Sequence, residues 1–147
     1  MPDLSVIVVS WNTRDLLLRC LETLRAAAGS SALETIVVDN GSTDGSLEAL
    51  RSLPDVRLIA NAENVGFAAA NNQGLAIATA PVALLLNSDA FVNGETLSRA
   101  VQVFAEQPRA GIVGVTVLND DGSVQAAEGV FPTLGSDLAA SIGLDQL

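Results

Sequence analysis

The fold is decided by an apolar run that stops abruptly at three polar residues, Val82-Ala83-Leu84-Leu85-Leu86-Asn87-Ser88-Asp89-Ala90. Such a run is typical of a strand that is buried on both faces of a parallel sheet. Open α/β sheets bind ligands beyond the carboxyl ends of their strands, which is where Asn87-Ser88-Asp89 would lie. Asp89 could hold a divalent cation or a hydroxyl group there. A single aspartate after a strand is also a common cap, so this stretch alone does not assign a function.

Segments that read as strands alternate with segments that read as helices along most of the chain. The strand-like runs lie at residues 4–9, 35–38, 56–59 and 82–86. The helical segments lie at residues 16–24, 46–52, 67–78 and 96–106. Asn12 or Thr13 is the expected N-cap of the first helix. This alternation predicts an α/β fold, with a mostly parallel sheet flanked by helices.

The pattern changes after the last of these helices. Residues 111–118 read as a further strand, and Asn119-Asp120-Asp121-Gly122 is a strong hairpin turn into residues 124–126. We therefore expect a C-terminal β-hairpin, whose edge between Val115 and Ala126 could pair two subunits into a homodimer. Residues 131–134 read as a loop, and a frayed helix could follow at 137–147.

Composition narrows the possible partners. A net charge of −10 argues against binding duplex nucleic acid through its phosphates. The apolar runs are far shorter than the ~20 residues of a membrane helix, so no transmembrane segment is expected. No basic segment precedes the first apolar run, which argues against a secretory signal. The single cysteine, Cys20, reads as a core residue and fits a reducing compartment. We expect a cytoplasmic protein, at the inner face of the membrane if a longer chain brings it there.

Polar residues gather just after three of the predicted strands, as Ser10-Trp11-Asn12, Asp39-Asn40 and Asn87-Ser88-Asp89. In a parallel sheet these stretches lie along one edge. Trp11 could stack on a planar base or pack in the core. Asp39 could accept a hydrogen bond from a base or ribose, or it could simply form an Asx turn. The chain has no histidine, so acid–base chemistry would fall to carboxylates.

Asn71 and Asn72 lie side by side within a predicted helix, where asparagine has a poor intrinsic preference. Two such residues suggest a demand from outside the helix, although a polar surface would also explain them.

Four stretches form an ordered set: Val6-Ile7-Val8-Val9-Ser10-Trp11-Asn12, Val37-Val38-Asp39-Asn40-Gly41-Ser42-Thr43-Asp44-Gly45, Glu63-Asn64-Val65-Gly66-Phe67-Ala68-Ala69-Ala70-Asn71-Asn72-Gln73-Gly74 and Leu85-Leu86-Asn87-Ser88-Asp89. This set resembles the family 2 glycosyltransferases of the GT-A (Rossmann-like) fold, particularly their bacterial rhamnosyltransferase-like branch. A later piece, from Gly111 to Leu134, also looks like that branch. The resemblance implies a GT-A nucleotide-sugar-binding domain at residues 1–134 and a tail at 135–147.

The resemblance also implies a donor site for a UDP- or dTDP-linked sugar. Its implied residues are Ser10, Trp11, Asp39, Asn40, Gly66, Asn71, Asn72, Asn87, Ser88 and Asp89. Asp39 would contact the base, and Asp89 would ligate the Mg²⁺ or Mn²⁺ that bridges the diphosphate. Asn87 stands where the family has the first acidic residue of its Asp-x-Asp element, so this chain brings one carboxylate rather than two.

The reaction implied is inverting transfer of a sugar, with rhamnose as the best guess, to a saccharide acceptor such as a cell-surface polysaccharide. In the family a carboxylate that comes later in the chain deprotonates the acceptor. No matching motif is present here, and neither Asp137 nor Asp145 can be given that role. We therefore expect this chain to carry mainly the donor site of a longer enzyme.

Two alternatives remain open from the sequence. The chain could be a nucleotide-sugar-binding module without catalysis. It could also be a nucleotidyltransferase, although such enzymes place a glycine-rich loop with a basic residue after the first strand. Here that position reads Ser10-Trp11-Asn12-Thr13-Arg14 and has no glycine, which disfavours this alternative.

Overall fold

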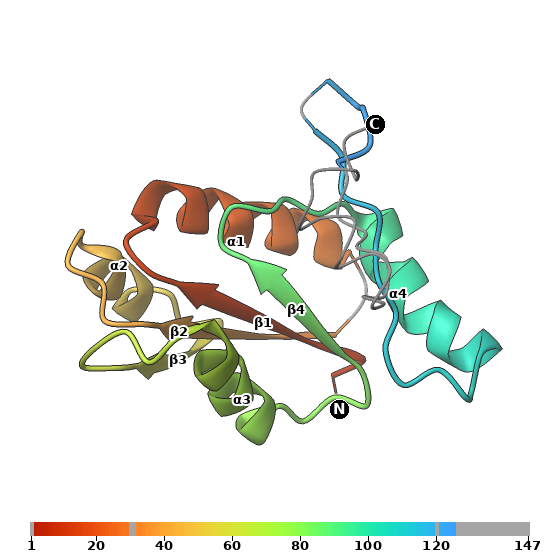
Figure 1. Ribbon diagram of the computed structural model, residues 1–147, viewed down its shortest axis with the longest axis horizontal. Helices are drawn as coiled ribbons and strands as arrows, with labels where there is room; N and C mark the ends of the chain where they lie inside the picture. Colours follow the sequence, from red (N-terminus) through yellow and green to blue (C-terminus); the bar gives the residue numbers. More distant parts are fainter. Residues whose placement is uncertain (1, 30–31, 120, 126–147) are drawn as a thin grey trace, which may run out of the picture. The chain divides into compact units, whose positions relative to one another are not determined.

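Four parallel strands form the centre of the first part of the chain (Figure 1). The computed structural model describes residues 2–29, 32–119 and 121–125, which fall into two compact units, Met1–Gly111 and Ile112–Leu147. The strands are β1 (Leu4–Ser10), β2 (Leu33–Asp39), β3 (Val56–Ala60) and β4 (Ala83–Asn87). Their order in the sheet is β3-β2-β1-β4, so the first strand is central. This confirms the predicted parallel α/β sheet.

Helices cover both faces of the sheet (Figure 1). They are α1 (Arg14–Ala28), α2 (Ser46–Arg51), α3 (Phe67–Ile77) and α4 (Gly94–Glu106). Helices α1, α2 and α4 lie over one face, and α3 lies over the other. Every predicted helix and strand of this unit is present, with ends that differ by a few residues.

Alternation along β1 builds the two cores. Leu4, Val6 and Val8 face α1, whose inward side carries Leu17 and Leu24 with Cys20 and Leu21 between them. Val9 faces the other way, against Ala70 of α3. All seven residues of β1 are buried, as expected for a central parallel strand. The apolar run that forms β4 is interpreted from the sequence as buried on both faces, but β4 lies at the edge of the sheet and Leu85 is exposed, so that interpretation is wrong.

Helix α3 approaches the sheet closely because it presents small residues to it. Ala70 and Gly74 are buried on its inner side. A Cβ atom added at Gly74 would lie 2.5 Å from Cγ2 of Ile7, closer than any ordinary contact. Gly74 therefore sets the distance between α3 and β1.

The second unit differs from its prediction. Residues 111–118 form no strand, and the described part of the expected hairpin holds a single antiparallel bridge between Leu118 and Val124. The turn is present: Gly122 has φ of 82°, and the Asn119 N–H donates to the Ser123 carbonyl at 2.8 Å. A strand needs a neighbour for its backbone groups, and Ile112 is 94% exposed. Pairing between subunits through this edge stays a prediction.

The remaining predictions for this unit, the loop at 131–134, the helix at 137–147 and the tail from 135, lie outside the described residues. Within the described residues, no helix has both the length and the apolar character that crossing a membrane requires.

Replacing Gly74 by alanine tests the close approach of α3. Alanine favours a helix over glycine by about 1 kcal/mol, but the clash with Ile7 should outweigh this and destabilise the fold by about 1–3 kcal/mol. Urea unfolding measures the difference. Gly111→Ala is the matched control, because a Cβ there meets nothing within 4 Å. Equal stability of the two variants would show that α3 can move away from β1 at no cost.

Candidate functional site

The carboxyl ends of three adjacent strands bring the predicted polar stretches together. Ser10 at the end of β1 is paired with Asp39 at the end of β2, and Val9 is paired with Asn87 at the end of β4. The prediction that these stretches share one edge is therefore confirmed.

Asn87-Ser88-Asp89 forms a tight turn in which the Ala90 N–H donates to the Asn87 carbonyl at 3.1 Å. Asn87 and Asp89 are exposed, whereas Ser88 between them is 7% exposed. The Asp89 carboxylate makes no hydrogen bond or ion pair with the described residues. Oxygen atoms of this kind suit Mg²⁺ or Mn²⁺. The described residues contain no cluster of three or more metal-ligating side chains, so Asp89 could supply only part of a coordination shell.

A chain of hydroxyl groups connects this turn to the end of β1. Ser88 Oγ lies 2.9 Å from Thr13 Oγ1, which lies 3.0 Å from Ser10 Oγ. Thr13 is the N-cap residue of α1, as one of the two predicted alternatives had it, but its side chain caps no helix N–H. Its hydroxyl instead connects the end of β1 with the turn after β4.

Cys20 lies beneath the same turn. Its Sγ is 3.8 Å from the Asn87 carbonyl oxygen and is buried. Burial and, to a smaller extent, the negative charge of Asp89 raise the pKa of the Cys20 thiol to about 11. Cys20 is therefore a core residue, as predicted, and its thiol is protonated at neutral pH.

The loops after β1 and β2 are tied together through Asn12. Its backbone is left-handed, with φ of 54°, a conformation that asparagine tolerates better than most residues. The Asn12 side-chain oxygen accepts from the Thr43 N–H at 2.8 Å, and the Asn12 N–H donates to Ser42 Oγ at 3.0 Å. Beside these contacts lies an open pocket of about 310 Å³, lined by Asn12, Thr13, Arg14, Asp15, Leu16 and Asp44.

Asp39 is fully buried at this edge. Its Oδ2 accepts from the Ser42 N–H at 3.1 Å, so the turn that the sequence offered as an alternative is present. Its Oδ1 is buried without a hydrogen-bond partner among the described residues. An unpartnered buried carboxylate oxygen is costly, and a ligand N–H or O–H would satisfy it.

Asn40 is turned inward, into a group of side-chain amides. Its Oδ1 accepts from Asn61 Nδ2 and from the Val65 N–H, both at 3.1 Å, and its Nδ2 donates to Asn64 Oδ1 at 2.8 Å. Asn61 and Gln73 exchange two further bonds of 2.9 and 3.1 Å. Asn40 therefore positions the loop before α3. The sequence reasoning missed Asn61, Asn64 and Gln73, because nothing in their spacing distinguishes them from surface amides.

The segment that opens α3 presents both buried and exposed groups. Gly66 has φ of 85°, a left-handed conformation that favours glycine. Asn71 is 4% exposed and donates to the Phe67 carbonyl at 2.9 Å, whereas Asn72 is exposed. The indole of Trp11 is 54% exposed, so it lies outside the core and is available for stacking.

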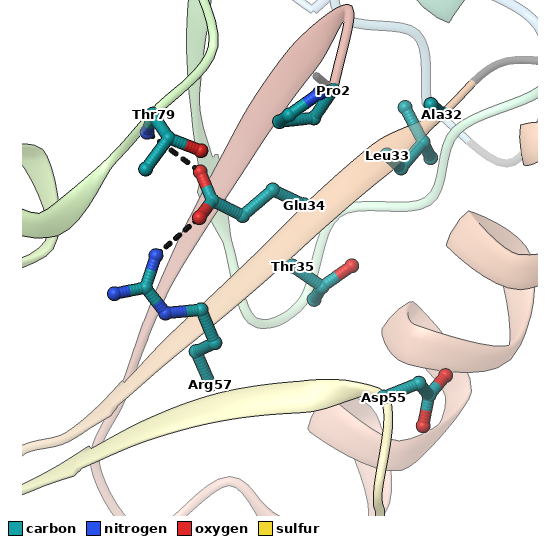
Figure 2. Close-up of a pocket in the computed structure, with 8 residues that line it drawn as sticks. All are labelled: Pro2, Ala32, Leu33, Glu34, Thr35, Asp55, Arg57 and Thr79. Carbon is teal, nitrogen blue, oxygen red and sulfur yellow. Dashed lines mark hydrogen bonds and ion pairs between the residues drawn. The ribbon is translucent and has the colours of Figure 1, made fainter.

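A second pocket, of about 510 Å³, lies at the amino ends of the strands, away from these residues (Figure 2). It is lined by Pro2, Ala32, Leu33, Glu34, Thr35, Asp55, Arg57 and Thr79. Its central charged side chain is Glu34, and both of its carboxylate oxygens accept hydrogen bonds from other residues of the chain. A structural role therefore explains this cluster better than a ligand does.

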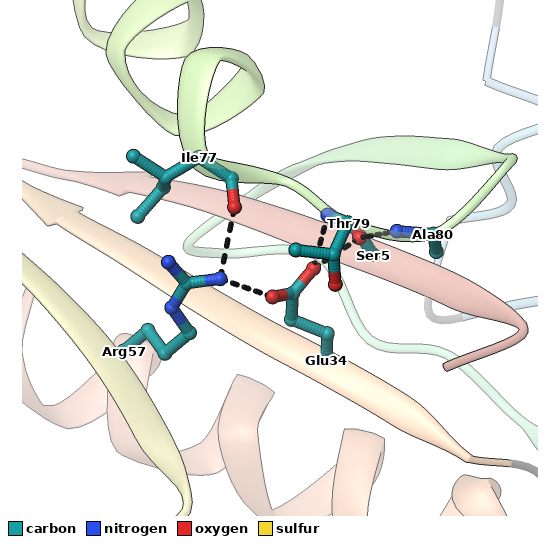
Figure 3. A network of polar contacts seen from close by, with 6 residues as sticks. All are labelled: Ser5, Glu34, Arg57, Ile77, Thr79 and Ala80. Carbon is teal, nitrogen blue, oxygen red and sulfur yellow. Dashed lines mark hydrogen bonds and ion pairs between the residues drawn. The ribbon is translucent and has the colours of Figure 1, made fainter. Parts of the chain in front are cut away.

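Glu34 fastens three strands and the chain segment before β4 (Figure 3). Its Oε2 accepts from Ser5 Oγ and from the Thr79 N–H, and its Oε1 pairs with Arg57, which also donates to the Ile77 carbonyl at 2.8 Å. Burial alone would raise the pKa of the Glu34 carboxyl. The hydrogen bonds from Ser5, Thr79 and Arg57 outweigh burial and lower the pKa to about 2.

Comparison with known proteins identifies the family. The chain belongs to glycosyl transferase family 2, whose model matches residues 5–135. Solved GT-A glycosyltransferases are its structural neighbours. The predicted family and fold are thus confirmed.

Two curated relatives represent its neighbours in sequence. The succinoglycan biosynthesis protein ExoO of Rhizobium meliloti is 30% identical over 88% of this chain and 36% of its own length. The N-acetylglucosaminyl-diphospho-decaprenol L-rhamnosyltransferase of Mycobacterium tuberculosis is 28% identical over 89% of this chain and 46% of its own length. The chain therefore spans less than half of either relative.

Two solved structures share the fold. The mannosyltransferase PcManGT from Pyrobaculum calidifontis, in complex with GDP-Man and Mn²⁺, is 31% identical, with a TM-score of 0.65 over 72% of this chain and 33% of that one. TarS 1-349 of S. aureus, in complex with UDP-GlcNAc, is 27% identical, with a TM-score of 0.61 over 72% of this chain and 32% of that one.

Glu34→Gln tests the structural role of the contacts that Glu34 makes with Ser5, Arg57 and Thr79. Because the folded pKa lies below the value of a free glutamate, ionised Glu34 stabilises the fold fully above about pH 5, and this contribution is lost as pH falls towards 2. The variant should be less stable at pH 7 by about 1–3 kcal/mol, and the difference should shrink on acidification. Urea unfolding across this pH range measures it.

Glu106→Gln is the matched control, because Glu106 forms an exposed pair with Arg99 on α4. Exposed pairs contribute about 0–1 kcal/mol. A difference between wild type and Glu34→Gln that stayed constant from pH 5 to pH 2 would contradict the assigned role.

Proposed function

We propose that this chain binds a nucleotide-diphospho-sugar together with a divalent cation, and provides the donor site for inverting transfer of the sugar to a saccharide acceptor. The observation that carries the proposal is the exposed Asp89 carboxylate, which has no partner in the part of the chain that the structure describes and lies on a turn at the carboxyl end of β4. Membership of glycosyl transferase family 2 supports the same reading.

In this proposal Asp89 supplies one anionic oxygen to Mg²⁺ or Mn²⁺. The neighbouring Asn87 amide adds an uncharged oxygen, and diphosphate and water complete the oxygen shell that such ions prefer. A cation bound there would neutralise the charge that develops on the departing nucleoside diphosphate. The Mn²⁺ in the complex of the similar mannosyltransferase supports the choice of a divalent ion.

Asp39 and Trp11 are proposed to bind the base. Asp39 Oδ1, which has no hydrogen-bond partner within residues 2–29, 32–119 and 121–125, would accept a hydrogen bond from a base N–H, and the exposed indole of Trp11 offers a stacking surface. Because Asp39 is buried, the base can reach it only after local opening of the edge. Uracil, thymine and guanine all carry a suitable N–H, so this contact is compatible with UDP, dTDP and GDP donors.

The remaining proposed site residues divide between contact and support. Asn72 is exposed and suited to touch the sugar-diphosphate. Ser10, Asn40, Ser88 and Asn71 are buried, and Gly66 shapes the backbone before α3, so these residues act mainly by holding the edge in place.

The sugar and the acceptor are proposed from the relatives. The L-rhamnosyltransferase relative favours rhamnose as the transferred sugar, and the succinoglycan relative favours a saccharide acceptor. We assign no catalytic base among the described residues. A nucleotide-sugar-binding module without catalysis is therefore the second candidate.

Asp89→Asn tests the proposed cation site. Wild type should bind UDP, dTDP or GDP more tightly when Mn²⁺ is present, and the variant should lose this gain by more than about tenfold, because metal affinity is sensitive even to residues outside the ligands. Titration calorimetry with and without Mn²⁺ measures it. Asp55→Asn is the control, since Asp55 pairs with Arg25 and lies by the other pocket. An unchanged gain in Asp89→Asn would remove Asp89 from the site.

Asp39→Asn tests the proposed base contact. Loss of a charged acceptor should weaken UDP binding by about tenfold or more, with or without metal. Binding of Mn²⁺-pyrophosphate, which has no base, should not change. If pyrophosphate and UDP lost affinity equally, Asp39 would act through the fold rather than on the base.

A further inference from the structure

We propose that Thr13 is a positioning residue, whose hydroxyl holds the Asn87-Ser88-Asp89 turn and so fixes the place of the Asp89 carboxylate. The inference rests on the proposed function of Asp89. Three observations carry it: the hydroxyl chain, the absence of a capping role for the Thr13 side chain, and the scarcity of other hydrogen bonds between the turn and the rest of the described residues.

The hydroxyl chain is short, and both partners of the half-buried Thr13 hydroxyl are buried. Thr13 Oγ1 lies 2.9 Å from Ser88 Oγ and 3.0 Å from Ser10 Oγ. Ser88 and Ser10 are only 7% and 1% exposed, so water replaces this contact poorly. Ser88 sits directly between the two exposed residues of the turn, and restraint of Ser88 is therefore transmitted to Asp89 through one peptide bond.

The Thr13 hydroxyl does not make the N-cap hydrogen bond that its position in the sequence predicts. A threonine at an N-cap normally accepts a hydrogen bond from an N–H of the first helical turn, worth about 1 kcal/mol. Here the Thr13 carbonyl accepts from the Leu17 N–H at 2.8 Å, but the side chain caps nothing. The hydroxyl instead reaches a residue 75 positions further along the chain. Helix α1 therefore gains little from this side chain.

The turn makes few other hydrogen bonds, although Ala90 packs against the hydrophobic core. The pairing of β4 with β1 ends at Asn87, opposite Val9. The hydrogen bond from the Ala90 N–H stays within the turn, and the Cys20 thiol reaches only the Asn87 carbonyl, at 3.8 Å. Among the described residues, the contact of Ser88 with Thr13 is the only hydrogen bond that ties residues 88–90 to another element.

Thr13→Val and Thr13→Ser separate positioning from folding. Valine matches threonine in shape but leaves Ser10 and Ser88 without their partner, whereas serine keeps the hydroxyl. Titration calorimetry with UDP, dTDP and GDP, each with and without Mn²⁺, gives the gain in affinity due to the cation. Thr13→Val should lose about tenfold of this gain, with metal-free affinity within about twofold of wild type. Thr13→Ser should retain the gain.

Thermal unfolding of each variant, with Glu34→Gln as the reference, controls for stability. Glu34→Gln should lower stability and keep the full cation-dependent gain, because it acts at the opposite edge of the sheet. If Thr13→Val fails to fold, Thr13→Ala takes its place and must lose the gain in the same way.

The outcomes distinguish this inference from the function on which it rests. If wild type shows no cation-dependent binding of any of the three nucleotides, the proposed function fails and the role of Thr13 fails with it. If wild type shows the gain and Thr13→Val keeps it, or loses it only in proportion to metal-free affinity, the positioning role is overturned and the proposed function stands.

Discussion

The structure depends on the complete burial of β1 between two parallel neighbours. Each of its seven residues is enclosed, so its backbone groups must be paired by β2 and β4 and its side chains must be aliphatic or satisfied. This pairing in register fixes where the strands end. Ser10, Asp39 and Asn87 consequently reach the same edge of the sheet, although they are far apart in sequence. The candidate site is thus a by-product of the way in which the core is built.

Polar side chains are bonded differently at the two ends of the parallel strands, called here the amino edge and the carboxyl edge of the sheet. At the amino edge, Glu34 has hydrogen bonds to both oxygens, and its low pKa reflects how fully the charge is satisfied. At the carboxyl edge, Asp39 Oδ1 has no hydrogen-bond partner among the described residues, and the exposed Asp89 carboxylate forms no hydrogen bond or ion pair with them. A buried acceptor without a partner reduces stability, whereas an exposed carboxylate is hydrated by water. The Asp39 Oδ1 atom is therefore the observation that favours a ligand at the carboxyl ends of the strands.

The fold of the first unit and the position of its polar stretches could be predicted because hydrophobic periodicity and turn residues agree. Periodicity placed every helix and strand of the first unit, and turn residues placed the polar stretches at strand ends. Which residues of those stretches are buried and which are exposed could not be predicted. Asn40 and Asn72 look equivalent in sequence, yet one is buried in an amide network and the other is exposed. The sequence offers Thr13 as an N-cap, but its hydroxyl forms a hydrogen bond with Ser88 in the turn after β4. The strand expected at 111–118 failed because an apolar pattern does not supply the neighbour that a strand requires.

The single carboxylate of the proposed cation site has a thermodynamic consequence. Asn87 supplies no charge, so Asp89 alone offers weak attraction to a divalent ion in water. A diphosphate would add the missing negative charge and further oxygen atoms. The cation and the nucleotide would then each raise the affinity of the other by the same factor, since coupling between two ligands is reciprocal. The size of that coupling depends on how firmly Asp89 is held. In a site with one carboxylate, the rigidity of the turn therefore matters more than it would in a site with two.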